Sequence, residues 1–167
     1  AIEKALDEPI PREMLAEVEK ALPSDVAIMV AAVADWRAAD EAEQKIKKDG
    51  SGQTPTLAFV ENADILATLA QSPRAQSGAL YCVGFAAETN DVLAYARSKL
   101  ERKGLKMVAA NLVGDGKAFD QDNNALEVVW PSGSTSLPDM DKKRLAQALM
   151  KLISAHYQTW KQQDGTH

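Results

Sequence analysis

The sequence has few residues from which a disulfide or a metal site could be built. Cys82 is the only cysteine among 167 residues, so an internal disulfide is excluded. Two histidines, His156 and His167, lie far from it in sequence, and no zinc site of usual ligand spacing can be written. Because Cys82 lies in the apolar run LYCVGF without a cationic neighbour, we predict a buried, unreactive thiol.

Positive charge and long apolar runs are also lacking. Nineteen Lys and Arg residues against twenty-four Asp and Glu residues give a net charge of −5, which argues against a nucleic acid partner. No apolar run has the length needed to cross a bilayer, and the stretch AIEKALDEPI has no signal-peptide features. We therefore expect a cytoplasmic protein without a membrane partner, in which any anion site is local.

The common nucleotide-binding fingerprints are absent as well. No predicted strand is followed by a G-x-G-x-x-G turn, and no G-x-x-x-x-G-K-[ST] loop occurs. These absences argue against a dinucleotide-dependent reductase and against a P-loop nucleotidase.

What the sequence does contain is an alternation of apolar runs and helical patterns. Hydrophobic residues make up 46% of the chain, enough for the core of one domain over residues 1–167, with residues 1–11 and 158–167 peripheral or flexible. Side-chain spacing predicts helices at residues 11–22, 63–70, 91–103 and 142–157. Apolar runs predict strands at residues 26–33, 56–60, 79–85, 107–111 and 126–130. This alternation predicts an α/β fold with an open, mostly parallel sheet.

Ligands of such sheets gather where the strands end, and three junctions qualify: residues 34–36, 86–89 and 111–113. Lys45, Lys47 and Lys48 follow the first junction, and Lys99 and Lys103 lie one turn apart on a predicted helix, where both can reach one anion. Both groups also have simpler interpretations, as a solvated charge run and as cations that complement a helix dipole. From these residues alone, the prediction is an α/β domain with a candidate phosphate-ligand site.

Six motifs extend this prediction by resemblance. The motifs are AAVADWR, KIKK, ENADIL, VGFAAET, KLERKGL followed by Ala110-Asn111, and DNNAL. In this order and spacing, they make the chain resemble phosphopantothenate-cysteine ligase, the C-terminal half of the bacterial bifunctional coenzyme A biosynthesis flavoprotein, from about Met14 to Tyr157. The resemblance implies a Rossmann-like three-layer fold with helices on both faces of the sheet.

The resemblance also implies an activity. Members of this family condense 4'-phosphopantothenate with cysteine through an acyl-cytidylate, using CTP and Mg2+, act as dimers, and are fused to a flavin-dependent decarboxylase domain. The chemistry suits a lysine-rich site, because a carboxylate is a poor electrophile and the charge on departing pyrophosphate must be stabilised by positioned cations.

Residues at family positions follow from the same motifs. Lys45 matches a catalytic lysine on a mobile flap. Lys99 and Lys103 match triphosphate-binding lysines, and Phe85, with the chain around Gly84, matches the cytosine site. The complete predicted nucleotide site comprises Ala31, Asp35, Lys45, Ala63, Asp64, Ile65, Leu66, Phe85, Lys99 and Lys103.

A substrate contact and several departures complete the resemblance. Asn111 matches a substrate-binding asparagine, and no metal ligand is assigned. Ala63 and Leu112 stand where the family has Pro and Asp, and the loop at residues 114–118 also differs. The family's first strand, its Gly-rich SGGTRE turn and the following Arg and Asn are missing, so the chain resembles the C-terminal two-thirds of the ligase domain. The alternative hypothesis is therefore a catalytically incomplete nucleotide-binding or assembly fragment.

Overall fold

The computed structural model of the chain describes residues 11–39, 56–113 and 122–164. They belong to two compact units, which we describe separately. The sheet unit comprises Pro23–Ala31 and Ile65–His167, and the ribbon unit comprises Ala1–Leu22 and Ala32–Asp64. The ribbon unit is thus partly inserted, in sequence, between the first strand and the remainder of the sheet unit. None of the helices in the described ranges is long and apolar enough to cross a membrane.

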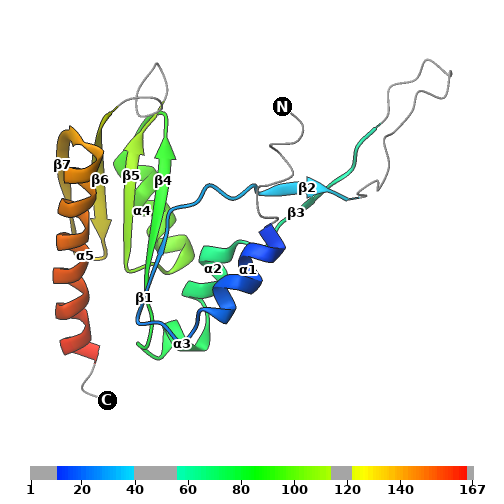
Figure 1. Cartoon of the computed structure of the whole chain (residues 1–167), viewed down its shortest axis with the longest axis horizontal. Coiled ribbons are helices and arrows are strands. Elements are labelled where there is room, and N and C mark those ends of the chain that lie inside the picture. Colours follow the sequence, from blue (N-terminus) through cyan, green and yellow to red (C-terminus); the bar gives the residue numbers. More distant parts are fainter. Residues whose placement is uncertain (1–10, 40–55, 114–121, 165–167) are drawn as a thin grey trace. The chain divides into compact units, whose positions relative to one another are not determined.

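The sheet unit contains a five-stranded mixed sheet in the order β1-β4-β5-β6-β7 (Figure 1). Its parallel half is formed by β1, β4 and β5, and the antiparallel half by β6 and β7. The strands are β1 (Val26–Met29), β4 (Tyr81–Glu88), β5 (Met107–Leu112), β6 (Asn123–Trp130) and β7 (Gly133–Asp141). The apolar runs LYCVGF and MVAA therefore lie in the interior strands β4 and β5, where both faces can be covered.

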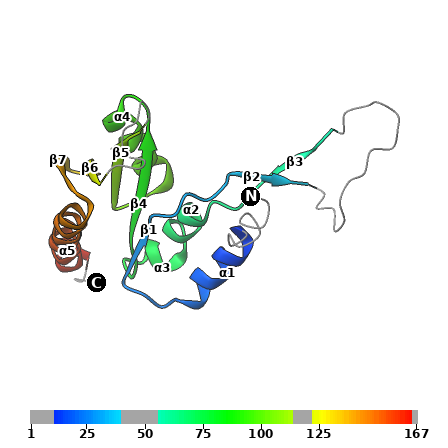
Figure 2. The same ribbon diagram turned by 45° about the horizontal axis from the view of Figure 1, so that its top comes forward.

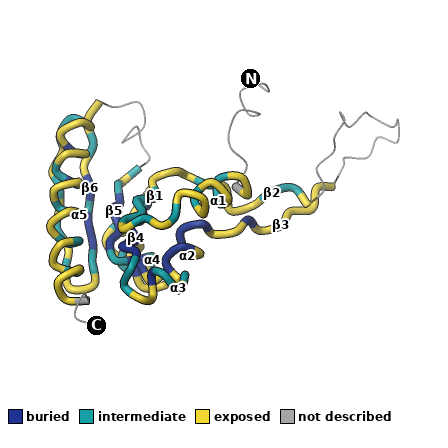
Figure 3. The backbone as a smooth tube through the Cα atoms, turned by 60° about the horizontal axis from the view of Figure 1, so that its bottom comes forward, coloured by how far each residue is buried: buried dark blue, intermediate teal, exposed yellow. Residues whose placement is uncertain are grey.

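Helices cover both faces of this sheet (Figures 2 and 3). On one face, Leu145, Leu149 and Ile153 of α5 (Lys142–Asp164) join a buried cluster with Val83 and Val128. The opposite face carries α2 (Ile65–Ala70), α3 (Pro73–Gln76) and α4 (Val92–Lys103). The predicted three-layer α/β architecture is thus confirmed.

Gly84 shows how closely the layers pack. A Cβ atom at this position would lie 2.7 Å from Leu66 Cδ2 and 2.9 Å from Leu105 Cδ1, closer than such atoms approach one another. The absence of a side chain at residue 84 therefore lets α2 and the start of β5 approach the middle of β4.

The ribbon unit contains one helix and a short two-stranded ribbon. Helix α1 spans Pro11–Lys20, and β2 (Trp36–Ala38) pairs antiparallel with β3 (Phe59–Glu61). Both strands are short, and every residue of β3 is exposed. A pair of this size is marginally stable by itself, so other interactions must hold it in place.

Several elements differ from the sequence prediction. The strand expected at residues 26–33 ends at Met29, and the strand expected at residues 56–60 is β3, which pairs with β2 outside the main sheet. Helix α5 continues to Asp164 instead of ending at residue 157. Strand β7 was not predicted, because its sequence GSTSLPDMD is polar and contains Pro138. Proline is tolerated there because β7 is an edge strand and the register shifts opposite Asn124 and Leu126.

Candidate functional site

In the sheet unit, the structure brings together two of the predicted nucleotide residues, Lys99 and Phe85. The ammonium nitrogen of Lys99, on α4, donates a hydrogen bond of 2.7 Å to the backbone carbonyl oxygen of Phe85, on β4. The ring of Phe85 packs against the buried cluster on the α5 face. A half-buried cation therefore lies beside the strand whose backbone was predicted to read a base.

Lys103 extends this cationic face of α4. It lies in the last turn of the helix, together with Arg102, and is half-buried. Gly104 ends the helix in the left-handed conformation, with φ 70°, and its N–H bonds to the carbonyls of Leu100 and Glu101. Lys99 and Lys103 are thus fixed on one well-terminated helix, one turn apart, as the sequence predicted.

Two further predicted residues of the sheet unit, Ile65 and Leu66, are buried in its core, where they are 3% and 8% exposed. Their side chains are unavailable to a ligand, and what these positions can offer is backbone. Ala31 follows β1 and is exposed.

The ribbon unit holds Asp35, Ala63 and Asp64, all of them exposed. The carbonyl oxygen of Asp35 accepts a hydrogen bond of 2.8 Å from the backbone N–H of Asn62, which immediately precedes Ala63. Within this unit, Asp35 and the residue that precedes Ala63 are therefore joined through their backbones. Lys45 lies outside the described residues.

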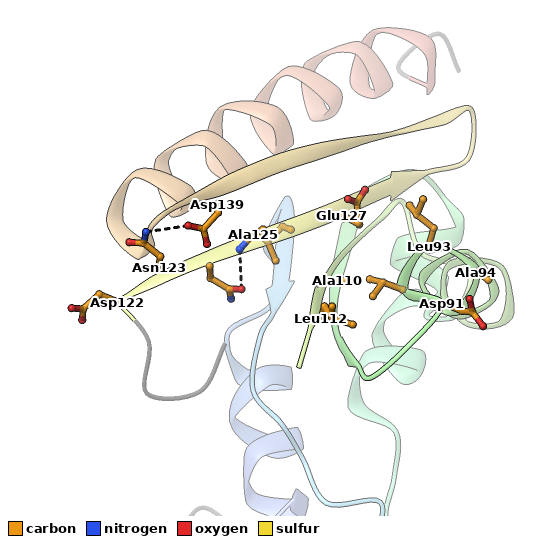
Figure 4. Close-up of a pocket in the computed structure, with 13 residues that line it drawn as sticks. Asp91, Leu93, Ala94, Ala110, Leu112, Asp122, Asn123, Ala125, Glu127 and Asp139 are labelled. Carbon is orange, nitrogen blue, oxygen red and sulfur yellow. Dashed lines mark hydrogen bonds between the residues drawn. The ribbon is translucent and has the colours of Figure 1, made fainter. Parts of the chain in front are cut away.

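A separate cavity of about 1290 Å³ opens at the carboxyl end of β5 (Figure 4). It is lined by the start of α4, the end of β5, the beginning of β6 and β7, with carboxylates from Asp91, Asp122, Glu127 and Asp139. The side chain of Asn123 donates a hydrogen bond of 3.1 Å to Asp139. Sequence reasoning quoted the DNNAL motif, which supplies residues 122–126 of this wall, but assigned no role to it.

Asn111 does not line this cavity. Side chains alternate along a strand, and its neighbours Ala110 and Leu112 are the β5 residues that line the cavity. Asn111 therefore lies on the opposite face of β5, the face to which Ala109 contributes in the cluster under α5.

Comparison with known proteins identifies the family. The model of the DNA/pantothenate metabolism flavoprotein C-terminal domain matches residues 10–157. The chain belongs to this family. Among family members, the coenzyme A biosynthesis bifunctional protein CoaBC of Vibrio cholerae is 45% identical over 139 residues, which make up 83% of this chain and 34% of that protein. The chain thus spans about a third of the length of the curated relatives it matches.

Solved structures show the same fold. The crystal structure of the C-terminal domain of a CoaBC protein matches with a TM-score of 0.65 and 28% identity, over 89% of this chain and 63% of that one. A Cab2 mutant in complex with phosphopantothenate-cysteine matches with a TM-score of 0.60 over 81% of this chain and 44% of that one. At 18% identity, the second likeness concerns the fold alone.

Two titratable groups at the start of β4, Tyr81 and Cys82, have raised pKa values. Burial raises the pKa of the Tyr81 hydroxyl to about 12. Burial also raises the pKa of the Cys82 thiol to about 11, although the nearby charge of Lys106 partly opposes the shift. The predicted burial of Cys82 is thus confirmed, whereas the prediction that it has no cationic neighbour is wrong, because the charge of Lys106 acts on it. Since burial outweighs this charge, a protonated thiol is favoured, and the thiolate is the reactive form.

The described residues contain no group of three or more His, Cys, Asp or Glu side chains that could hold a metal ion. Magnesium usually retains several waters and is bound through substrate phosphates with one or two carboxylates. Such a site would not require a group of three side chains, and no magnesium ligand is assigned among the described residues.

Proposed function

We propose that the chain is the nucleotide-binding part of a phosphopantothenate-cysteine ligase that uses CTP. The observation that carries this proposal is the family match over residues 10–157, in which Lys99 and Phe85 meet. The Cab2 complex contains phosphopantothenate-cysteine, the type of product that such a ligase would release.

The proposed reaction has two steps. The carboxylate of 4'-phosphopantothenate attacks the α-phosphorus of CTP, pyrophosphate leaves, and an acyl-cytidylate forms. The amino group of cysteine then attacks the acyl carbon, an amide bond forms, and CMP leaves with the electron pair of the broken carbon–oxygen bond. The proton lost by the amine passes to solvent or to a base.

Within this reaction, the lysines have defined tasks. Lys99 and Lys103 present cations on one face of α4, and their attraction for the triphosphate would increase as charge develops on the departing pyrophosphate. To reach a phosphate, the Lys99 ammonium exchanges its hydrogen bond with the Phe85 carbonyl or shares it, since an ammonium has three donors. Lys45 is proposed as the catalytic lysine that completes the site.

We also propose roles for the other predicted site residues. Asp35, Ala31 and residues 63–66 contact the nucleotide, and the exposed backbone beside Ala63 can do so although proline is replaced there. Asn111 is proposed as a substrate contact. Magnesium is proposed to arrive on the triphosphate oxygens. We also propose a cytoplasmic homodimer of one ligase domain per chain, working with a flavin-dependent decarboxylase.

Calorimetric titration with CTP and ATP tests the nucleotide part of this proposal. We expect binding of CTP and weaker binding of ATP, because the family position of Phe85 is a cytosine site. If the chain does not bind CTP, the proposal is wrong.

A second candidate function is a catalytically incomplete fragment that binds the nucleotide or takes part in assembly. It is favoured by the span of the chain, which covers 63% of the solved C-terminal domain, and by the missing SGGTRE turn. Incubation with CTP, phosphopantothenate and cysteine separates the two functions. Release of pyrophosphate at an enzymatic rate would exclude the fragment, whereas CTP binding without pyrophosphate would favour it.

A further inference from the structure

Asn62 is the exceptional side chain of the ribbon unit. It is 7% exposed, and no other polar or charged residue within the described ranges is buried to this degree. It directly follows β3, whose residues are all exposed. A buried amide is costly unless its donors and acceptor are satisfied, so its partners show what it is there to hold.

Two of these partners lie in the segment that immediately precedes β2. The amide nitrogen of Asn62 donates a hydrogen bond of 2.8 Å to the carbonyl oxygen of Ala34. Its backbone N–H donates a second hydrogen bond, also of 2.8 Å, to the carbonyl oxygen of Asp35. One residue thus holds two successive carbonyls of a segment that lies 28 residues away in sequence.

Arg37 completes this network. Its guanidinium donates to the side-chain oxygen of Asn62 at 3.0 Å and to the backbone carbonyl of Glu61 at 2.9 Å. The arginine therefore orients the amide of Asn62, because the oxygen that faces the guanidinium leaves the nitrogen facing Ala34. Both the donor and the acceptor of the Asn62 side chain are thereby used.

The network lies between two segments proposed to contact the nucleotide. Asp35 is bound through its carbonyl, so its exposed carboxylate projects from a fixed backbone. Ala63 and Asp64 immediately follow Asn62. The short β2–β3 ribbon alone would leave this geometry loosely defined, and contacts that are held before binding cost less entropy when the ligand arrives.

We propose that Asn62 and Arg37 are positioning residues that hold the Asp35 segment and the backbone at residues 63–64 in the geometry that receives the nucleotide. This inference rests on the proposed function. Neither side chain needs to touch the nucleotide. Their effect is expected on affinity for CTP, because groups that are not held in place before binding must be ordered when the ligand arrives, which costs free energy.

Calorimetry on the chain with CTP tests the proposal with graded variants. Asn62→Ala removes both side-chain hydrogen bonds, and we expect CTP to bind at least about tenfold more weakly. Asn62→Asp keeps the acceptor for Arg37 but places a carboxylate oxygen against the Ala34 carbonyl, so we expect a similar loss. Arg37→Lys retains a donor and should keep more affinity than Arg37→Ala.

Controls separate positioning from a general loss of structure. Val18→Ala removes two methyl groups from the half-buried face of α1 in the same unit and leaves the network intact. Gln76→Ala removes an exposed amide that donates to the carbonyl of Gln71 in the sheet unit. Both should bind CTP as the unmodified chain does. Hydrogen exchange of the Asn62 backbone N–H should accelerate in Asn62→Asp even if circular dichroism is unchanged.

The outcomes distinguish the two proposals. If the unmodified chain binds CTP and the Asn62 variants bind it equally well, positioning is wrong and the proposed function stands. An equal loss of CTP affinity in Val18→Ala would also overturn positioning, since a general loosening of the unit would then be enough to explain the loss. If the unmodified chain binds no CTP, the proposed function is wrong, and positioning for that nucleotide is wrong with it.

Discussion

Val83, Met107 and Val128 in the sheet unit are completely buried, whereas Trp36 and Phe59 in the ribbon unit are 60% and 61% exposed. The sheet unit is therefore stabilised mainly by apolar burial between its layers. The ribbon unit instead depends, around Asp35, on the hydrogen bonds of one buried amide. Burial of apolar surface is non-directional, while a hydrogen bond requires a defined distance and angle between its atoms. The sheet unit thus has a scaffold held by apolar burial, and the ribbon unit has a segment of defined geometry, which we propose contacts the nucleotide.

The comparison is most strongly tested by the pair Met107→Ala and Phe59→Ala. Met107 is 0% exposed, so its truncation should lower the free energy of unfolding by about 3 kcal/mol through lost burial and a residual cavity. Phe59 is 61% exposed, and its truncation should change that free energy by less than about 0.5 kcal/mol. Urea unfolding followed by circular dichroism measures both. Equal losses would contradict the contrast between the units.

A second prediction asks whether the scaffold itself contributes to binding. Lys99→Ala should weaken CTP binding about tenfold or more, because a hydrogen bond between an ammonium and a phosphate is charge-assisted. Lys106→Ala is the matched control, since Lys106 is also half-buried but its ammonium lies 5.6 Å from the ring centroid of Trp160. Calorimetry should show unchanged affinity in this control. Unchanged affinity in Lys99→Ala would leave nucleotide binding to other residues.

A third prediction concerns pH and the core of the sheet unit. Burial raises the pKa of Tyr81 from 10.0 to about 12, so the folded state retains a proton that the unfolded state loses. The corresponding stability is fully present below pH 10 and is lost as the pH rises towards about 12.

Between these pH values, the free energy of unfolding should therefore fall less steeply with pH in Tyr81→Phe than in the unmodified chain. Cys82, with its pKa raised to about 11, affects both proteins alike, so their difference reports Tyr81. Tyr95→Phe, at a position that is 50% exposed, controls for loss of a hydroxyl. A slope that is the same in Tyr81→Phe and in the unmodified chain would contradict the prediction.

The smallest effect is expected on the surface of the ribbon unit. Lys20 pairs with Glu17 at 2.7 Å on α1, but the two side chains are 71% and 70% exposed. Solvent screens such a pair, so Lys20→Met should change the free energy of unfolding by less than about 0.5 kcal/mol. Thermal unfolding at low and at high salt provides the measurement. A larger, salt-dependent loss would mean that surface charge stabilises this unit.

The sheet could be predicted from the sequence wherever burial is reflected in apolar runs. LYCVGF and MVAA are recognisable as strands because both of their faces are covered, and the helix at residues 91–103 is recognisable from its spacing. Strand β7 could not be recognised in this way, because an edge strand can be polar and tolerate Pro138. Of the ribbon, β3 corresponds to the strand predicted at residues 56–60, but β2 and its pairing with β3 were missed, since β2 has only three residues.

The candidate site could be predicted only in part. The meeting of Lys99 with Phe85 follows from motifs that lie on adjacent elements of an α/β unit. The role of Asn62 could not be predicted, because its partners are 25 and 28 residues away and no periodic pattern links them. The cavity beside β5 combines four segments of chain, and the sequence indicated two of them, the junction at residues 111–113 and the DNNAL motif.

The insertion of the ribbon segment between β1 and the other strands has a consequence for the order of folding. Strands β6 and β7 are adjacent in sequence and can form a hairpin that starts at their turn, where Trp130 pairs with Gly133. Pairing of β1 with β4 joins Val26 to Tyr81 and must close a loop that includes the ribbon. Closing this long loop costs conformational entropy before the β1–β4 contacts can offset it, so this pairing forms more slowly than a local hairpin. We therefore expect β1 to join the sheet last, so that residues leading to Asp35 become ordered only when the rest of the scaffold already exists.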